Sequence, residues 1–159
     1  MRRRATGVEL LLAVLFVLLV VGAATRLGRH ETARIVADPV RTPGVLNPDV
    51  TQETIGSTIC RRGWTRTIRP PVEYTNALKL RQMKEYGETG PPSAYQEDHL
   101  ISLELGGHPT DPRNLWPEPY PRAREVDAIE NELNAEVCDG TLTLAEAQQR
   151  ESALKHRDG

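Results

Sequence analysis

The sequence predicts an α+β fold in which a short β-hairpin is flanked by helices, after an N-terminal apolar helix. Three observations support this prediction. Apolar and polar residues alternate over 99–105 before Gly106-Gly107, as in a strand that ends at a turn. Apolar residues recur at three- and four-residue steps over 126–137, which indicates an amphipathic helix. A capping-box pattern at 143–146 marks the start of a further helix.

The N-terminal segment is strongly apolar. Arginines at positions 2–4 precede a 15-residue apolar run over 10–24. Its length lies between that of a signal-peptide core and the ~17 to 25 residues of a membrane span. We therefore expect residues 1–24 to be a signal peptide or an N-terminal membrane anchor that inserts residues 8–24. Either alternative exports the rest of the chain, which would be secreted or held on the outer side of the cell membrane.

The stretch 25–49 contains three prolines and no sustained periodicity, so we expect a flexible linker there. The folded domain is then expected over 50–159. Within it, residues 57–72 include several β-branched side chains and end at Pro70-Pro71. This composition predicts a short strand or an extended arm.

A helix is expected over 75–86, and Gly87 would end it. Its packing face would consist of Leu78, Leu80, Met83 and Tyr86.

The central hairpin is expected to begin at Asp98-His99. Four residues would share one face of its first strand, namely His99, Ile101, Leu103 and Leu105. Residues 106–113 are rich in Gly and Pro, which favours a turn. A second strand from Asn114 would pair with the first and bring Asn114 back towards His99.

Two helices are expected after the hairpin. The first carries Val126, Ile129, Leu133 and Val137 on one face and runs to Cys138. The second begins at Thr143 and runs towards Lys155.

The two cysteines, Cys60 and Cys138, are expected to form a disulfide, because an exported domain meets oxidising conditions and an even count allows pairing. Such a bridge would restrict the unfolded chain by on the order of 4 kcal/mol in the loop-entropy model. The alternative is a pair of buried free thiols. The absence of further cysteines and of a Cys-x-x-Cys motif argues against a structural zinc knuckle.

Charge gives opposing indications about nucleic acid. Removing residues 1–24 takes three arginines and Glu9 from the 20 basic and 22 acidic residues, leaving 17 against 21. This net acidity is unfavourable for a nucleic-acid-binding protein. However, four arginines lie close together before the hairpin and are candidate phosphate contacts, the alternative being a solvated surface. They are Arg61, Arg62, Arg66 and Arg69.

Asp98, His99 and Asn114 suit metal-assisted phosphodiester cleavage. A phosphodiester is anionic and has a poor leaving group, so its hydrolysis needs a base to activate water and a cation to neutralise developing charge. His99 suits the base role, since imidazole with a pKa of ~6.5 is mostly neutral near pH 7. A hydrogen bond at its other ring nitrogen would fix the tautomer. His108, next to the glycine pair, is an alternative base.

The segments EDHLISLELGG and PRNLWPEP resemble the HNH branch of the His-Me finger nucleases. The wider pattern of TIC, RPP, YTNALK and EVCDGTLTLAEAQ resembles small exported bacterial proteins described as HNH-like, over roughly the last two thirds of the chain. The resemblance implies a ββα-metal unit, that is, a hairpin plus a helix, over 50–159. It also implies a metal-dependent endonuclease that acts outside the cytoplasm. DNA is the favoured substrate and RNA the second choice.

The resemblance implies roles for individual residues. His99 would be the base, Asp98 a metal ligand, and Asn114 would hold the loop or orient the histidine. The metal would be Mg²⁺, with Mn²⁺ or Zn²⁺ as alternatives. The chain departs from the family where a second ligand is expected, because Arg122 or Ala123 stands there. The nearby carboxylates Glu118, Glu125 and Asp127 are candidate substitutes.

A second hypothesis follows from that departure. The chain would then be a non-catalytic exported binding or structural domain that keeps the HNH-like scaffold. Net acidity and Arg122 favour it. The sequence indicates no particular protein partner.

Overall fold

A two-stranded antiparallel sheet lies between helices in the computed structural model, which describes residues 36–120 and 122–157. All of these residues belong to one compact unit, 35–159. Its α-helices and strands are α2 (Trp64–Ile68), α3 (Val72–Tyr86), β1 (Tyr95–His99), β2 (Leu115–Pro119), α4 (Arg122–Asp139) and α5 (Leu144–Arg157). The predicted α+β class is confirmed.

The hairpin forms, but its first strand lies earlier than predicted. β1 and β2 pair with Tyr95 opposite Pro119 and His99 opposite Leu115. Residues 101–105 are not a strand, contrary to the alternation, because Ile101 exchanges both backbone hydrogen bonds with the side chain of Asn114. The chain then closes a 3-10 turn over Leu103–Leu105.

The helices expected over 75–86, after the hairpin and from Thr143 are all present, as α3, α4 and α5. α3 ends at Gly87, whose φ of 73° lies in the left-handed region that glycine adopts without strain. The capping box before α5 is present: Glu146 N donates to Thr143 Oγ1, and Thr143 N donates to Glu146 Oε2. One predicted packing residue is wrong, since Leu80 is 51% exposed.

The stretch expected as a strand or arm, 57–72, is instead a series of turns and the short helix α2. Thr58 N and Cys60 N both donate back to Ile55 O, so backbone groups that a strand would offer to a neighbour are satisfied locally. Gly63, with φ 82°, then starts α2. β-branched residues here did not specify a strand, because no strand within 36–120 and 122–157 pairs with them.

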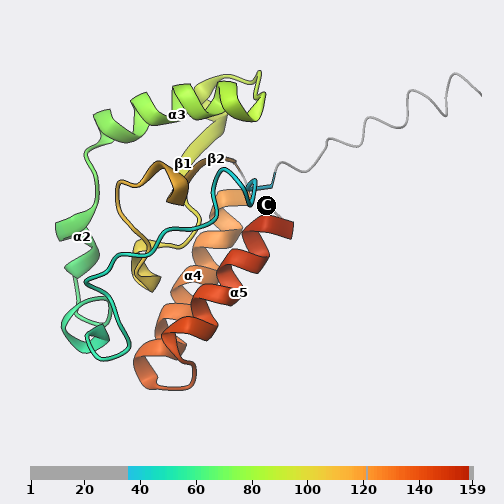
Figure 1. Cartoon of the computed structure of the whole chain (residues 1–159). Coiled ribbons are helices and arrows are strands. Elements are labelled where there is room, and N and C mark those ends of the chain that lie inside the picture. The colour runs from blue at the N-terminus through green and yellow to red at the C-terminus, as the bar shows by residue number, and fades with distance from the viewer. Residues whose placement is uncertain (1–35, 121, 158–159) are drawn as a thin grey trace, which may run out of the picture. The chain divides into compact units, whose positions relative to one another are not determined.

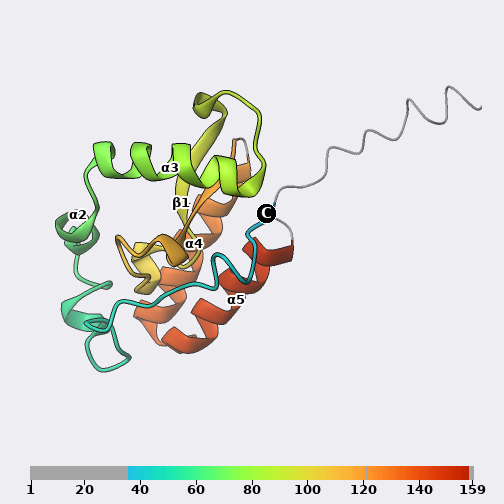
Figure 2. The ribbon, with the colours of Figure 1, turned by 45° about the horizontal axis from the view of Figure 1, so that its top comes forward.

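The long helices enclose the hairpin. α3 contacts both strands, α4 contacts β2, and α5 packs beside α4 (Figures 1 and 2). The larger apolar cluster joins the loops before α2 to these last two helices, and it comprises Val50, Ile59, Ile101, Leu105, Leu133, Val137, Leu142, Leu144 and Ala147. A smaller cluster of Ala37, Leu100 and Trp116 lies beneath Tyr86.

The predicted disulfide is confirmed. Cys60 and Cys138 are bonded, with their Cα atoms 5.5 Å apart and a sequence separation of 78 residues. The bridge ties the turn before α2 to the last turn of α4. It therefore fixes the arginine-bearing segment beside the helix that follows the hairpin.

Residues 36–49, expected as part of a linker, pack against the domain instead. Ala37 and Thr42 are completely buried, and Leu46 forms a β-bridge with Gly107. Buried backbone needs partners, and Ala37 N finds one in Lys155 O. The expected N-terminal apolar helix, signal peptide or anchor and linker residues 25–35 lie outside the described residues. Within 36–120 and 122–157, no helix is long and apolar enough to span a bilayer.

Candidate metal and catalytic site

A cavity of about 500 Å³ opens where β1 ends, between the segment after α2 and the first half of α4. Its volume is within the range of ligand-binding clefts. Its lining is unusually rich in ionisable groups: Arg69, Glu97, Asp98, His99, Glu104, Asp127 and Glu130. Two of the three residues that the sequence singled out, Asp98 and His99, therefore lie together at this cavity.

His99 is held in one tautomer. Its Nε2 atom lies 3.1 Å from Pro109 O, and a carbonyl can only accept, so Nε2 carries the proton and Nδ1 has the lone pair. Burial lowers the pKa of His99 from its ordinary value, although the charge of Asp98 partly opposes this. The imidazole is therefore neutral at neutral pH and can accept a proton. The expected hydrogen bond at the other ring nitrogen is thus present.

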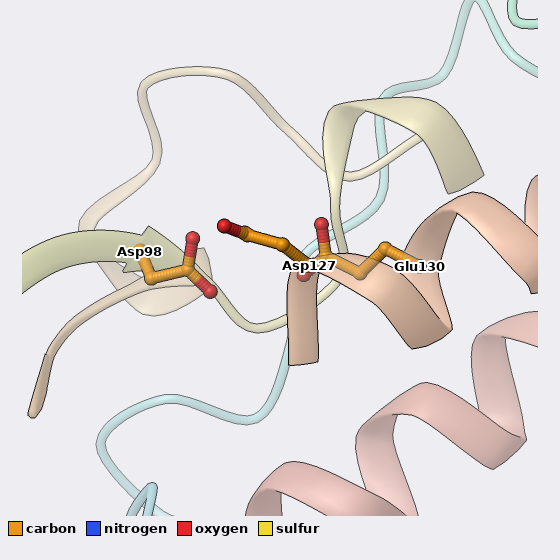
Figure 3. A group of neighbouring side chains, drawn as sticks. All are labelled: Asp98, Asp127 and Glu130. Atoms are coloured by element: carbon orange, nitrogen blue, oxygen red, sulfur yellow. The ribbon is translucent and has the colours of Figure 1, made fainter. Parts of the chain in front are cut away.

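Three carboxylates converge beside His99. Asp98 projects from β1 towards Asp127 and Glu130 on α4, and one oxygen of each lies within 4.8 Å of the others (Figure 3). Asp127 and Glu130 share a helix face because residues three apart are neighbours on a helix. Of the three substitutes that the sequence offered for the second ligand, Asp127 is the one in this group.

The other two substitutes are placed elsewhere. Glu125 is exposed on α4 and pairs with Arg122 at 2.8 Å. Glu118 is completely buried on β2, where burial and the charge of Asp98 raise its pKa to about 9. Glu118 is also not among the residues whose carboxylate oxygens lie within 4.8 Å of one another. At the expected ligand position, Arg122 pairs with Glu125, and Ala123 is buried and has no side-chain ligand atom. Neither residue therefore joins the group.

The carboxylate group fits a hard divalent cation. Mg²⁺ prefers oxygen ligands at about 2.0 to 2.1 Å, which places ligand atoms no more than about 4.2 Å apart. The 4.8 Å spread requires only small side-chain rotations to reach that geometry. Mn²⁺ accepts the same ligands, whereas Zn²⁺ is usually held by Cys or His, and this group contains neither.

A buried lysine contacts two of these three carboxylates. Lys155 on α5 is completely buried, and its Nζ atom lies 2.7 Å from Asp98 Oδ2 and 2.6 Å from Glu130 Oε1. It also donates to His99 O. Burial alone would lower the pKa of Lys155, but the surrounding carboxylates raise it well above its ordinary value, so the ammonium stays charged.

The single ammonium does not balance the buried carboxylates around it. The pKa of Asp98 falls to about 2, because Lys155 outweighs the effect of burial. In contrast, burial raises the pKa of Glu130, Glu151 and Asp127 despite the same ammonium. These three carboxyls therefore favour their protonated forms more than an exposed carboxyl does.

Asn114 holds the loop between the strands. It is completely buried, and its side chain bonds Ile101 N and O at 3.0 Å and His108 O at 3.1 Å. Gly107 packs against it so closely that a Cβ there would overlap Ile101 O. Asn114 does not line the cavity, so it positions the segment that leads away from His99 and does not itself contact a ligand there.

The four candidate arginines are all exposed, but they do not line the same cavity. Arg69 lines the main cavity. Arg61 and Arg62 line a second hollow of about 290 Å³ over the disulfide, and Glu104 borders both. Arg66 lines neither of these two. His108, the alternative base, accepts from Thr110 N and Asp111 N and so stabilises its own turn.

Sequence reasoning missed Glu130 and Lys155. Glu130 could have been found from its spacing, since it follows Asp127 by three residues on the predicted helix. Lys155 gave no such signal, because a lysine in the last turn of a helix is usually solvated and favoured there by the helix dipole.

Comparison of the chain with protein-family models, with curated proteins and with solved structures gave no match.

Proposed function

We propose that this domain is a metal-dependent endonuclease that hydrolyses phosphodiester bonds in nucleic acid, with DNA the favoured substrate. The observation that carries the proposal is the placement of a neutral, tautomer-fixed His99 beside three converging carboxylates at one cavity. The order β1, β2, α4 and the resemblance to HNH nucleases support a ββα-metal arrangement.

In this proposal the residues divide the work of hydrolysis. His99 Nδ1 accepts a proton from the attacking water, and the Pro109 carbonyl stabilises the imidazolium that results. Asp98, Asp127 and Glu130 would hold the divalent ion through their carboxylate oxygens. When bound, that ion supplies the positive charge that the phosphate and the leaving oxygen require. Arg69 at the rim attracts the phosphate backbone.

We propose that the reaction takes place outside the cytoplasm. The Cys60–Cys138 disulfide supports this location, since such bonds persist in oxidising compartments. The apolar run over 10–24 and the arginines before it support export by a signal peptide or an anchor.

Plasmid nicking by the full-length protein tests the proposal. With Mg²⁺ or Mn²⁺ we expect nicked DNA, no nicking in excess chelator, and a loss of about 10²-fold or more in His99→Ala, the usual contribution of a general base. Asp127→Asn should also lose activity. Glu125→Gln is the matched control, because Glu125 lies on the same helix but outside the carboxylate group. Absence of cleavage with every divalent metal would refute the proposal.

The second candidate is a non-catalytic exported binding or structural domain. Lys155 favours it, because an ammonium already pairs with Asp98 and Glu130 and allows the cluster to be buried without metal. This candidate predicts no heat of Mg²⁺ or Mn²⁺ binding by calorimetry. Measurable binding that Asp98→Asn removes would exclude it.

A further inference from the structure

The Lys155 ammonium lies in an oxygen-lined position of the kind that hard cations prefer. Asp98 Oδ2, Glu130 Oε1 and Glu151 Oε1 lie 2.7, 2.6 and 3.4 Å from Nζ, and His99 O accepts a further hydrogen bond. Three carboxylates and a carbonyl would also suit a divalent ion. A tethered ammonium therefore stands where an oxygen-bound cation could be held.

Two of these carboxylates also belong to the candidate metal group. Asp98 and Glu130 face Lys155 with one oxygen each and converge on Asp127 as well. The other oxygen of Asp98, Oδ1, accepts from Gln96 Nε2 at 3.0 Å instead of from the ammonium. Enzymes that bind two metals about 3.5 to 4 Å apart share carboxylates in this way, so an ion at the Asp98–Asp127–Glu130 group would be a neighbour of the ammonium.

The lysine is rigidly placed. Its neighbour Glu151, one turn earlier on α5, accepts the N–H of Ser102 with both carboxylate oxygens, at 2.9 and 3.0 Å. Lys155 itself has no exposed surface, so it cannot contact a substrate. Its effect on chemistry must therefore pass through Asp98, Glu130 and the backbone of His99.

We infer that Lys155 is a positioning residue whose ammonium permanently fills the second cation position, so that the site takes one divalent ion and presents Asp98 and Glu130 to it. This inference rests on the proposed metal-dependent function. It explains how a cavity with so many acidic groups can act with a single exchangeable ion. It also assigns to α5 a part of the site that the hairpin and α4 do not supply.

Counting bound Mn²⁺ by calorimetry and electron paramagnetic resonance tests the inference with the full-length protein. We expect one ion in the wild type and two in Lys155→Ala, which removes the charge and leaves room for a cation. Lys155→Met removes the charge but fills the space with a methyl group, so the count should stay at one. Arg150→Ala is the control, since it removes an exposed cation from the same helix.

Activity should separate positioning from substrate binding. Lys155→Ala should lower kcat in plasmid nicking by roughly 10-fold or more, through displaced carboxylates, and leave KM for DNA almost unchanged. The unfolding temperature of Lys155→Ala should fall in chelator and recover in excess Mn²⁺. One ion in Lys155→Ala at wild-type affinity, or two in the wild type, would overturn the inference and leave the nuclease proposal standing. No ion in the wild type but one in Lys155→Ala would refute the metal-dependent nuclease and overturn the inference with it, because the wild-type site would then take no divalent ion.

A measurement on the wild type decides the matter if Lys155→Ala does not fold. The protons of a buried lysine ammonium exchange slowly with solvent, so its ¹⁵N signal can be followed by nuclear magnetic resonance. Saturating Mg²⁺ should shift the Lys155 signal without removing it. An unmoved signal, or loss of the signal because the ion displaces the ammonium, would contradict the inference.

Discussion

Burial acts in opposite directions on the pKa values of Asp98 and His99, the last two residues of β1. It lowers the pKa of His99, whose charged form is a cation, whereas Asp98 stays ionised, with a pKa of about 2, because Lys155 outweighs burial. The strand therefore presents a neutral imidazole and an ionised carboxylate side by side at neutral pH. Because the two residues are adjacent in sequence, the difference in their charge states comes from the groups packed around each side chain.

The titration of His99 predicts the acid limb of the pH–rate profile. The base works only when neutral, so kcat/KM for nicking should fall as the pH drops through the pKa of His99. Because burial lowers this pKa, and a bound cation would lower it further, the fall should be centred below pH ~6.5, the ordinary value. His156→Gln is the control, since His156 bonds Thr42 O away from the cavity and should leave the limb in place. A limb centred above that value would contradict the role of His99.

The elements differ in how far the sequence predicts them. Helices α3, α4 and α5 were predictable because their apolar spacing, the glycine stop and the capping box are local signals. The end of β1 was not, because the amide of Asn114, 13 residues away, takes the backbone bonds of Ile101. Likewise, Asp98, His99 and Asp127 of the site were within reach of sequence reasoning, whereas Lys155 depends on how α5 docks.

The helix α2 and its C-cap residue, Arg69, provide a matched pair of arginines for testing the proposed DNA surface. Arg69 follows α2 and lines the main cavity, whereas Arg66 lies within α2 and lines neither of the two hollows. In chelator, Arg69→Gln should weaken DNA binding and reduce the slope of log K against log salt by about 0.9, the value for one phosphate contact. Arg66→Gln should leave the slope almost unchanged. Equal effects in the two variants, measured by fluorescence anisotropy over a salt series, would contradict a specific role for Arg69.

The disulfide joins parts of the molecule that lie far apart in sequence. It links the turn before α2 to the end of α4, and both border the larger apolar cluster. Asp127 and Glu130 lie in the first half of α4, two to three turns before Cys138. The bridge should therefore contribute to the stability of the whole domain more than to the geometry of the site.

Replacing both cysteines tests this division. The Cys60→Ser/Cys138→Ser variant should lose about 2 to 4 kcal/mol of unfolding free energy, because the unfolded chain regains the entropy of a long loop. Urea unfolding followed by circular dichroism measures the loss. Reduced wild type should match the variant. Nicking activity well below the unfolding transition should be preserved, and its abolition in a folded variant would show that the bridge also shapes the site.

The position of Lys155 along the chain has a consequence for the order of folding. Its partners Asp98, His99 and Glu130 lie 57, 56 and 25 residues away, so none of these contacts can form before α5 docks. An intermediate in which the hairpin and α4 have formed but α5 has not docked would hold the same carboxylates without the ammonium, and their mutual repulsion would keep them apart. The proposed metal group would thus reach its final geometry only when α5, the last helix along the chain, has docked.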